Sequence, residues 1–115
     1  MARQLDFRHV QLDRVCCIKS QGSKTRRTIA RIHALGKVMQ LGMNTKAFYV
    51  IEFISEKFDR QSEEEKTKTI IHELLHIPAS FGGGFRQHHL VNSAAVERHY
   101  ARLMQQNRLQ AENRI

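Results

Sequence analysis

The heptapeptide IIHELLH at residues 70–76 is the most informative part of this chain. An α-helix has about 3.6 residues per turn, so His72 and His76 lie on one face, where both imidazoles can reach a single tetrahedral metal ion. Glu73 directly follows the first histidine, as in the H-E-x-x-H pattern of zinc peptidases, where this carboxylate stands over the open coordination position. The stretch therefore predicts an active-site helix in which His72 and His76 bind zinc and Glu73 is the general base.

The sequence around this heptapeptide also favours a helix. Ser62 followed by Glu65 is typical of a capping box, and the glutamates at residues 63–65 suit the positive end of a helix dipole. Pro78 ends the helix soon after the second histidine, because the residue before a proline is pushed out of helical geometry. An apolar stripe beside the metal face consists of Ile71, Leu74 and Leu75. The competing interpretation is a buried core helix that carries two histidines by chance.

A catalytic zinc site needs a third protein ligand and one open position. Three glycines at residues 82–84 allow backbone angles closed to other residues, so the chain can turn sharply and return a histidine to the metal. The two histidines that follow, His88 and His89, are the candidates. Glu97 on the next predicted helix is the alternative, because thermolysin-like enzymes take their third ligand from that place. We expect one Zn²⁺ per chain.

Three stretches also carry a resemblance to a known family: YVIEFISEKFD at residues 49–59, SEEEK at 62–66 and HELLHIP at 72–78. They resemble a family of small metallopeptidases from archaea, some bacteria and phages, which is distantly related to the SprT-like zincins. The resemblance covers about residues 12–100. Its most specific part is the helix together with the pattern after it, which consists of Phe81, Gly83, Gly84, Arg86 and His88.

This resemblance implies a zincin architecture in which His72, His76 and His88 bind zinc and Glu73 is the general base. Relatives need not have a histidine at the position of His89, which ranks His88 above it. Minimal zincins usually place a helix ahead of the first strand, whereas strand-like sequence begins here by about Val10.

A missing first helix would leave one face of the sheet uncovered. We therefore expect a homodimer or larger oligomer that buries this face, since exposed apolar patches invite partners. The competing possibility is that residues 1–9 form a short covering segment that uses Leu5 and Phe7.

The apolar pattern predicts an α+β fold, with a small mixed β-sheet of about three strands, the active-site helix and a C-terminal helix. The resemblance implies that this fold is minimal zincin-like. Residues 10–19 and 28–34 are predicted strands on either side of a polar turn around Gly22, which together suggest a hairpin. Residues 47–54 are the clearest strand, because nearly continuous branched and aromatic residues are typical of a buried strand. We expect the second or third strand to offer the edge along which a peptide substrate binds.

The remaining segments complete a single domain over residues 1–115, because 115 residues of which 41% are hydrophobic supply one core of modest depth. Residues 36–44 fit either a short helix or irregular chain. Residues 90–107 predict an amphipathic helix that packs over the site, with a polar tail from about residue 105 that frays.

The composition of the chain indicates the cellular compartment in which we expect the protein. No apolar run approaches the length of a membrane span, and the first residues are polar rather than a signal peptide, so we expect a cytoplasmic protein with no membrane partner. Cys16 and Cys17 are adjacent, so they cannot form an ordinary disulfide with each other, and on a strand they point to opposite faces. We interpret them as reduced thiols with no part in a metal site.

The net charge is +8, from 19 basic and 11 acidic residues. Basic residues cluster over residues 19–37, and others line the last predicted helix at Arg98, Arg102 and Arg108. Such a surface can contact phosphate backbones, and SprT-like relatives include proteases that act on DNA-bound proteins. Nucleic acid is therefore a candidate partner, although a solvated basic surface is the simpler explanation.

Two functions fit these observations. One is a zinc-dependent peptidase acting on a peptide or protein substrate; the other is a noncatalytic zinc-stabilised module, with nucleic acid as a candidate partner. Glu73 favours the first, because a structural zinc site closes all four positions with protein ligands and has no use for a carboxylate over an open one. In a peptidase, the candidates to stabilise the oxyanion or contact the substrate are Arg86, Tyr49, His99 and Tyr100.

Overall fold

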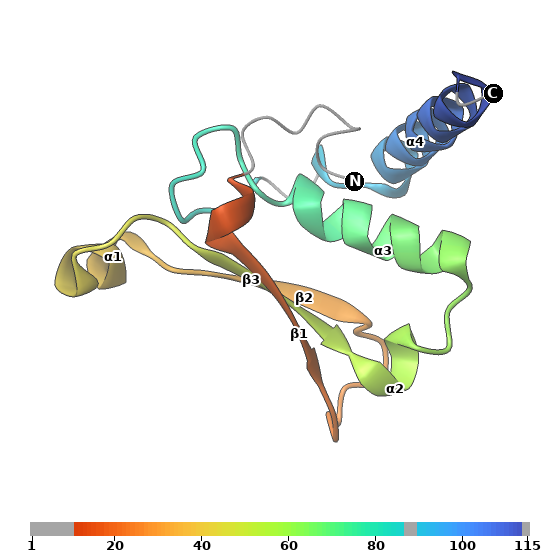
Figure 1. Ribbon diagram of the computed structural model, residues 1–115. Helices are drawn as coiled ribbons and strands as arrows, with labels where there is room; N and C mark the ends of the chain where they lie inside the picture. Colours follow the sequence, from red (N-terminus) through yellow and green to blue (C-terminus); the bar gives the residue numbers. More distant parts are fainter. Residues whose placement is uncertain (1–10, 87–89, 114–115) are drawn as a thin grey trace.

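The computed structural model describes residues 11–86 and 90–113 (Figure 1). In chain order the elements are a 3-10 turn, η1 (Leu12–Arg14), then β1 (Val15–Ser20), β2 (Ala30–Ala34), α1 (Lys37–Met43), β3 (Tyr49–Ile54), α2 (Ser55–Phe58), α3 (Glu63–Leu75) and α4 (Ser93–Asn113). The strands form one mixed three-stranded sheet. The predicted α+β class is therefore confirmed, together with its C-terminal helix.

The central strand of the sheet is β3, in the order β1-β3-β2. It runs parallel to β1 and antiparallel to β2. The predicted hairpin between the first two strands is therefore wrong, because β3 lies between them. The sequence YVIEFI explains this, since strands with nearly continuous apolar residues take the most buried place in a sheet. A central strand has no free edge, so of the two strands predicted to bind a substrate only β2 has one.

The segment between β1 and β2 is tied to α2 rather than folded into a tight turn. Ser20 and Ala30 lie beside Ile54 and Phe53, so the connection passes the end of β3, where α2 begins. Gly22, with a φ of 74°, donates its backbone N–H to the Glu56 carboxylate. These contacts hold the nine residues that connect β1 to β2 as they cross from one edge of β3 to the other. In the sequence, the turn residues of such a crossing look the same as those of a hairpin.

Alternate residues of the sheet face α3 and form the core. Tyr49, Ile51 and Phe53 of β3 are buried on this side. They pack with α3 and α4, chiefly through Ile71, Leu74, Leu75, Val96 and Leu103. Figure 1 shows α3 alongside the sheet, with α4 beyond it. Fully burying one aliphatic side chain stabilises a fold by about 1.5–3 kcal/mol, so this packing fixes α3 against the sheet.

Both ends of α3 agree with the sequence. Ser62 Oγ accepts the backbone N–H of Glu65 at 3.2 Å, and the Glu65 carboxylate accepts the backbone N–H of Ser62 at 3.2 Å, which completes the predicted capping box. His76 follows the last helical residue with a φ of −70° and a ψ of −18°, close to helical geometry. The spacing of His72 and His76 on one face is therefore kept.

Three boundaries differ from the sequence-based prediction. β1 starts at Val15 rather than at residue 10, since the preceding residues form the 3-10 turn, whose Arg14 side chain donates to the carbonyls of Lys46 and Ala47. The undecided segment, residues 36–44, contains the helix α1. The predicted fraying from about residue 105 is wrong, because α4 continues to Asn113 through residues of high helix propensity such as leucine, glutamine, arginine and alanine.

The opposite face of the sheet is open within the described part of the chain. Ile18 of β1 is 46% exposed on this side, and a groove of about 460 Å³ lies beside Val50. On the same face of the sheet, the Glu52 carboxylate lies 2.7 Å from Arg31 Nε and 2.8 Å from His33 Nε2. Hydrogen bonding by Arg31 lowers the pKa of Glu52 from 4.5 to about 2. The segment suggested as a cover, residues 1–9, lies outside the described residues.

Two smaller expectations can be compared directly. Cys16 and Cys17 are both free and exposed, and the alternation of the strand directs them to opposite faces of the sheet, as predicted. Among residues 11–86 and 90–113, no helix is both long and apolar enough to cross a membrane.

Candidate active site

The two histidines of the H-E-x-x-H motif face each other at the C-terminal end of α3. Their Nε2 atoms are 3.3 Å apart, and their ring centroids are 5.0 Å apart at an interplanar angle of 74°. Two nitrogens bound to one tetrahedral zinc at about 2.0–2.1 Å each are themselves about 3.3–3.4 Å apart. The pair His72 and His76 therefore has the separation that two imidazole ligands of one zinc ion require.

Glu73 lies beside this pair and is buried, with 6% of its surface exposed. Burial raises the pKa of Glu73 from 4.5 to about 7, because a charged carboxylate is costly away from water. A nearby cation has the opposite effect and favours the charged form. A buried carboxyl group next to two converging imidazoles is thus an arrangement that a bound metal ion stabilises.

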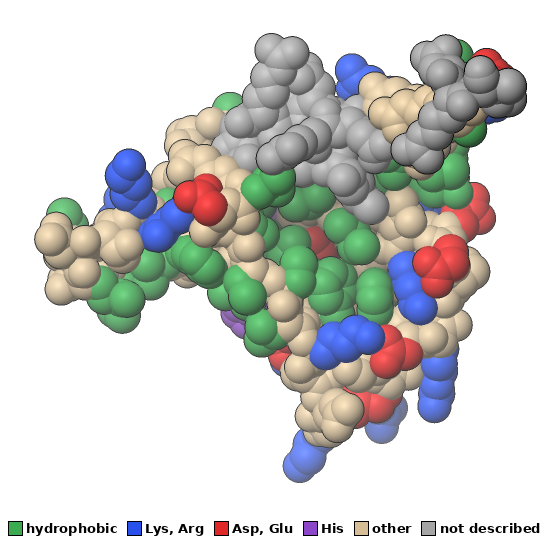
Figure 2. Space-filling view, viewed as in Figure 1, with side chains coloured by type: hydrophobic (Ala, Val, Ile, Leu, Met, Phe, Trp, Pro, Cys, Tyr) green, Lys and Arg blue, Asp and Glu red, His purple; other side chains and the backbone are tan. Residues whose placement is uncertain are grey.

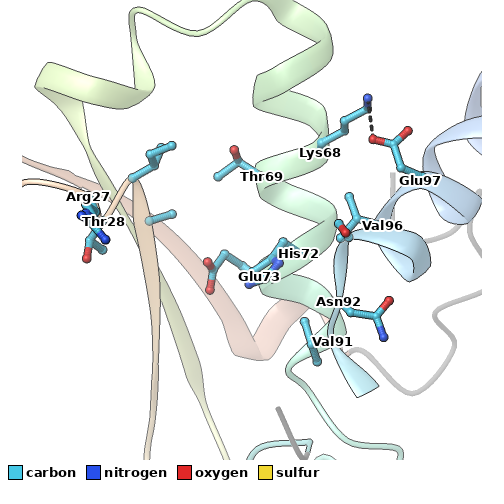
Figure 3. Close-up of a pocket in the computed structure, with 13 residues that line it drawn as sticks. Arg27, Thr28, Lys68, Thr69, His72, Glu73, Val91, Asn92, Val96 and Glu97 are labelled. Carbon is cyan, nitrogen blue, oxygen red and sulfur yellow. Dashed lines mark ion pairs between the residues drawn. The ribbon is translucent and has the colours of Figure 1, made fainter. Parts of the chain in front are cut away.

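Glu73 and His72 open into a pocket of about 510 Å³ (Figure 3). The pocket lies between the edge strand β2, the helix α3 and the start of α4. Figure 3 shows Glu73 extending from α3 into it, with Val91, Asn92 and Val96 on another wall. Part of the lining is apolar, contributed by Ile29, Ala30, Val91 and Val96. Because β2 is an edge strand of the described sheet, an extended peptide can pair with it beside Glu73.

Glu97, the alternative ligand, lies on a wall of the same pocket but is bound to another group. Its carboxylate is 2.8 Å from Lys68 Nζ, as the dashed line in Figure 3 marks. Lys68 Nζ is also 4.8 Å from the centre of the Tyr100 ring, so Tyr100 supports this ion pair. Within the described residues, no third histidine, cysteine, aspartate or glutamate joins His72 and His76 in a group that could hold a metal ion.

The loop after α3 returns to the C-terminal end of the helix, where His76 lies. Its sharp turn uses positive φ angles at Phe81 (47°) and Gly83 (100°), as the glycine run predicts. The backbone N–H of Arg86 then donates to the carbonyl of His76 at 2.7 Å. The loop thereby brings the chain next to the second histidine of the motif. His88 and His89 lie outside the described residues.

The structure gives Tyr49 a different environment from the one expected of an oxyanion donor. Its side chain is completely buried, and its hydroxyl donates to the Gly84 carbonyl at 2.7 Å and accepts the Gly83 N–H at 3.0 Å. Burial raises its pKa. Tyr49 therefore holds the glycine loop. Gln40 also contacts this loop, although the sequence did not single it out. Its one distinguishing feature is structural: it is buried, while the apolar residues around it in α1 are exposed.

His99 on α4 is the remaining candidate. Burial lowers its pKa, and the positive charges of Arg102, Arg98 and Arg86 lower it further. Neither His99 nor Arg86 is among the residues that line the pocket, so contact of either with a substrate stays a prediction.

The basic segment over residues 19–37 is partly neutralised. Lys19 lies 2.8 Å from an Asp59 carboxylate oxygen, and Arg31 pairs with Glu52. Figure 2 shows Lys and Arg side chains at the lower end of the molecule with acidic side chains between them. The described residues thus present a mixed charged surface at this end, and a nucleic-acid partner stays a prediction.

Comparison with known proteins agrees with the chemistry of this site. The profile of one family, described as "Putative phage metallopeptidase", matches residues 1–112. No curated protein and no solved structure was found to match the chain. The match spans nearly the whole sequence and includes α3 with both histidines, the glycine loop and most of α4. The chain therefore belongs to this phage metallopeptidase family.

Proposed function

We propose that this protein is a zinc-dependent peptidase with Glu73 as its general base. The observation that carries the proposal is the 3.3 Å separation of the Nε2 atoms of His72 and His76, together with a pocket that His72 shares with the buried Glu73 carboxyl group. Membership of a metallopeptidase family supports a metal cofactor and a peptide substrate. Imidazole nitrogens with an adjacent carboxylate are the donor set of catalytic zinc sites.

Bound zinc supplies an acidic water and polarises the scissile carbonyl. The residues of the chain account for the rest of the reaction. His72 and His76, whose Nε2 atoms converge, would hold the ion. Glu73 accepts the proton of the attacking water and returns it to the leaving nitrogen, for which a carboxyl group with a raised pKa is suited. The edge of β2 aligns the peptide, and the apolar walls of the pocket exclude bulk water around the reacting atoms.

We assign the third ligand to His88. The support is the Arg86 N–H to His76 carbonyl bond, which places the loop against the metal end of α3 two residues before His88. Two residues span at most about 7 Å, so the chain after Arg86 begins within reach of a metal held by His72 and His76. His89 is three residues after Arg86, a span of at most about 11 Å, and is therefore the second candidate. The alternative Glu97 is supported less, because its carboxylate is paired with Lys68.

Glu73→Gln tests the catalytic role. The amide has the shape of the carboxyl group but cannot accept a proton, so zinc content and thermal stability should stay at parental values. Cleavage of casein or a peptide library should fall by about 10²–10⁴-fold, the usual contribution of general acid–base catalysis. Glu112→Gln at the exposed end of α4 is the matched control, since it makes the same chemical change far along the chain from the site.

Full activity in Glu73→Gln would disprove this proposal. If neither parent nor variant cleaves any peptide while both bind zinc, the noncatalytic zinc-stabilised module becomes the better account.

A further inference from the structure

The loop at residues 81–86 has a backbone that needs support from outside. It contains no helix or strand, and Phe81 has a φ of 47°, a left-handed angle that costs a non-glycine residue about 1–2 kcal/mol. A strained loop keeps one shape only when neighbouring groups hold it there. The contacts of this loop therefore decide where the segment after Arg86 begins.

One contact that supports the loop comes from α1, a helix in which the usual burial pattern is reversed. The only buried residue of this helix is the polar Gln40, which is 8% exposed, whereas its large apolar side chains face solvent: Val38, Met39, Leu41 and Met43. Figure 2 shows hydrophobic side chains on this projecting end of the molecule. Apolar burial therefore does not explain how α1 is attached to the fold.

Hydrogen bonds from Gln40 do explain it. The Nε2 atom donates to the Leu35 carbonyl at 2.7 Å and to the Gly82 carbonyl at 3.0 Å. A carboxamide nitrogen carries two hydrogens, so both are used. One bond closes the turn that precedes α1, and the other crosses to the glycine loop. Gln40 thus couples α1 directly to the loop that leads away from the metal helix.

The fit around Gly83 shows how close this coupling is. A Cβ at Gly83 would lie 2.5 Å from the Leu35 carbonyl oxygen and closer still to the Gln40 amide nitrogen. On the other side, the Tyr49 hydroxyl accepts the Gly83 N–H and donates to the Gly84 carbonyl. Side chains from α1 and β3 therefore bind three consecutive glycines through three hydrogen bonds.

We propose that Gln40 is a positioning residue for the metal site, because its bond to Gly82, with Tyr49 bonded to the next two glycines, fixes the loop whose Arg86 N–H binds the carbonyl of His76. The inference rests on the proposed function, since it needs a metal ion held by His72 and His76. Gln40 acts through the loop and does not itself touch metal or substrate. It therefore affects metal affinity without contributing to catalysis directly.

Gln40→Glu is the sharpest test, because it keeps the shape of the side chain and replaces the donating nitrogen with an oxygen that faces two carbonyls. We expect the zinc dissociation constant, measured by competition with a chromogenic chelator, to rise about 10–100-fold, the usual effect of losing an outer partner of a metal ligand. Tyr49→Phe should act in the same direction. Val38→Ala, at an 81% exposed position of the same helix, is the control and should leave zinc affinity unchanged.

A glycine pair provides an independent test that leaves Gln40 in place. Gly83→Ala should weaken zinc binding, because the new methyl group displaces Gln40 and the φ of 100° suits only glycine. Gly84→Ala has nothing within 4 Å of the added Cβ and should bind zinc as the parent does. Circular dichroism of the metal-free proteins separates loss of positioning from loss of the fold.

The outcomes separate the two proposals. If the parent binds zinc and the folded Gln40→Glu and Gly83→Ala variants bind it equally well, the positioning role is wrong while the proposed function stands. If the Gln40 variant does not fold when metal-free, the Gly83 and Gly84 pair decides. A parent protein that binds no zinc would overturn the proposed function and this inference with it.

Discussion

The two halves of the candidate site are built in different ways. His72, Glu73 and His76 lie on or directly after α3, a capped helix of 13 residues packed against the sheet, so helix geometry alone sets their relative positions. The glycine loop has no such regular structure, and single side chains from distant parts of the sequence, Tyr49 and Gln40, hold it. The helix half should therefore keep its geometry when any one contact is lost. The loop half should lose its geometry when one of its few contacts is removed.

The largest effect should separate the two histidines that follow the loop. His88→Ala removes a proposed metal ligand, so zinc affinity should fall by at least about 10-fold, whereas His89→Ala should leave it near the parental value. Zinc content after dialysis, measured by mass spectrometry of the metal, provides the comparison. Equal loss in both variants would mean that the loop does not select one histidine, and retention in both would favour Glu97.

Self-association compares the two faces of the sheet. One face is covered by α3, and the other is open, with Ile18 46% exposed, so we expect a homodimer or larger oligomer that buries the open face. Ile18→Lys should then shift sedimentation at micromolar concentration toward the monomer. Leu109→Lys, at a 50% exposed position on α4, is the matched control. A stable parental monomer would remove the reason for this proposal.

A change at the start of α3 should affect stability without affecting the metal. Ser62→Ala removes the N-cap that accepts the Glu65 N–H, which should lower the free energy of unfolding by about 1 kcal/mol. Packing still holds α3 in place, so zinc affinity should not change. Urea unfolding and chelator competition check the two parts. A parallel loss of zinc affinity would show that the helix half is less independent than its geometry implies.

The smallest effect should be the pH dependence of the stability that Glu52 contributes on the open face of the sheet. The folded pKa of Glu52 is about 2, below the ordinary 4.5, so its contribution to stability is fully present above about pH 4.5 and is lost as the pH falls toward 2. The stability difference between the parent and Glu52→Gln should therefore shrink over this range. Urea unfolding at several pH values measures it. A difference that stays constant would mean that Glu52 is not charge-paired in the folded protein.

The same contrast explains how much the sequence could predict. The helix α3, its capping box and its end before Pro78 depend on residues a few positions apart, and all three predictions are confirmed. The hairpin prediction failed because the place of β3 between the other strands depends on its pairing with β1, whose residues lie 34 positions earlier in the chain. Tyr49 looked like an oxyanion donor because its contacts with Gly83 and Gly84 cannot be deduced from spacing.

Gln40 illustrates the limit most clearly. It lies in a segment that fitted either helix or irregular chain, among residues whose apolar character suggests burial. The structure reverses this pattern, since the apolar residues are exposed and the amide is buried against a loop that lies 42 residues further along the chain. Only the three-dimensional contact reveals such a role.

The central claim is an open, catalytic zinc site, and the most direct test counts the ligands of the metal. X-ray absorption spectroscopy at the zinc edge should show three imidazole nitrogens and one oxygen from water, in purified protein that elemental analysis finds to hold one zinc per chain. Four protein ligands would contradict the claim, because the site would be closed and structural. Protein that binds no zinc at all would contradict it as well.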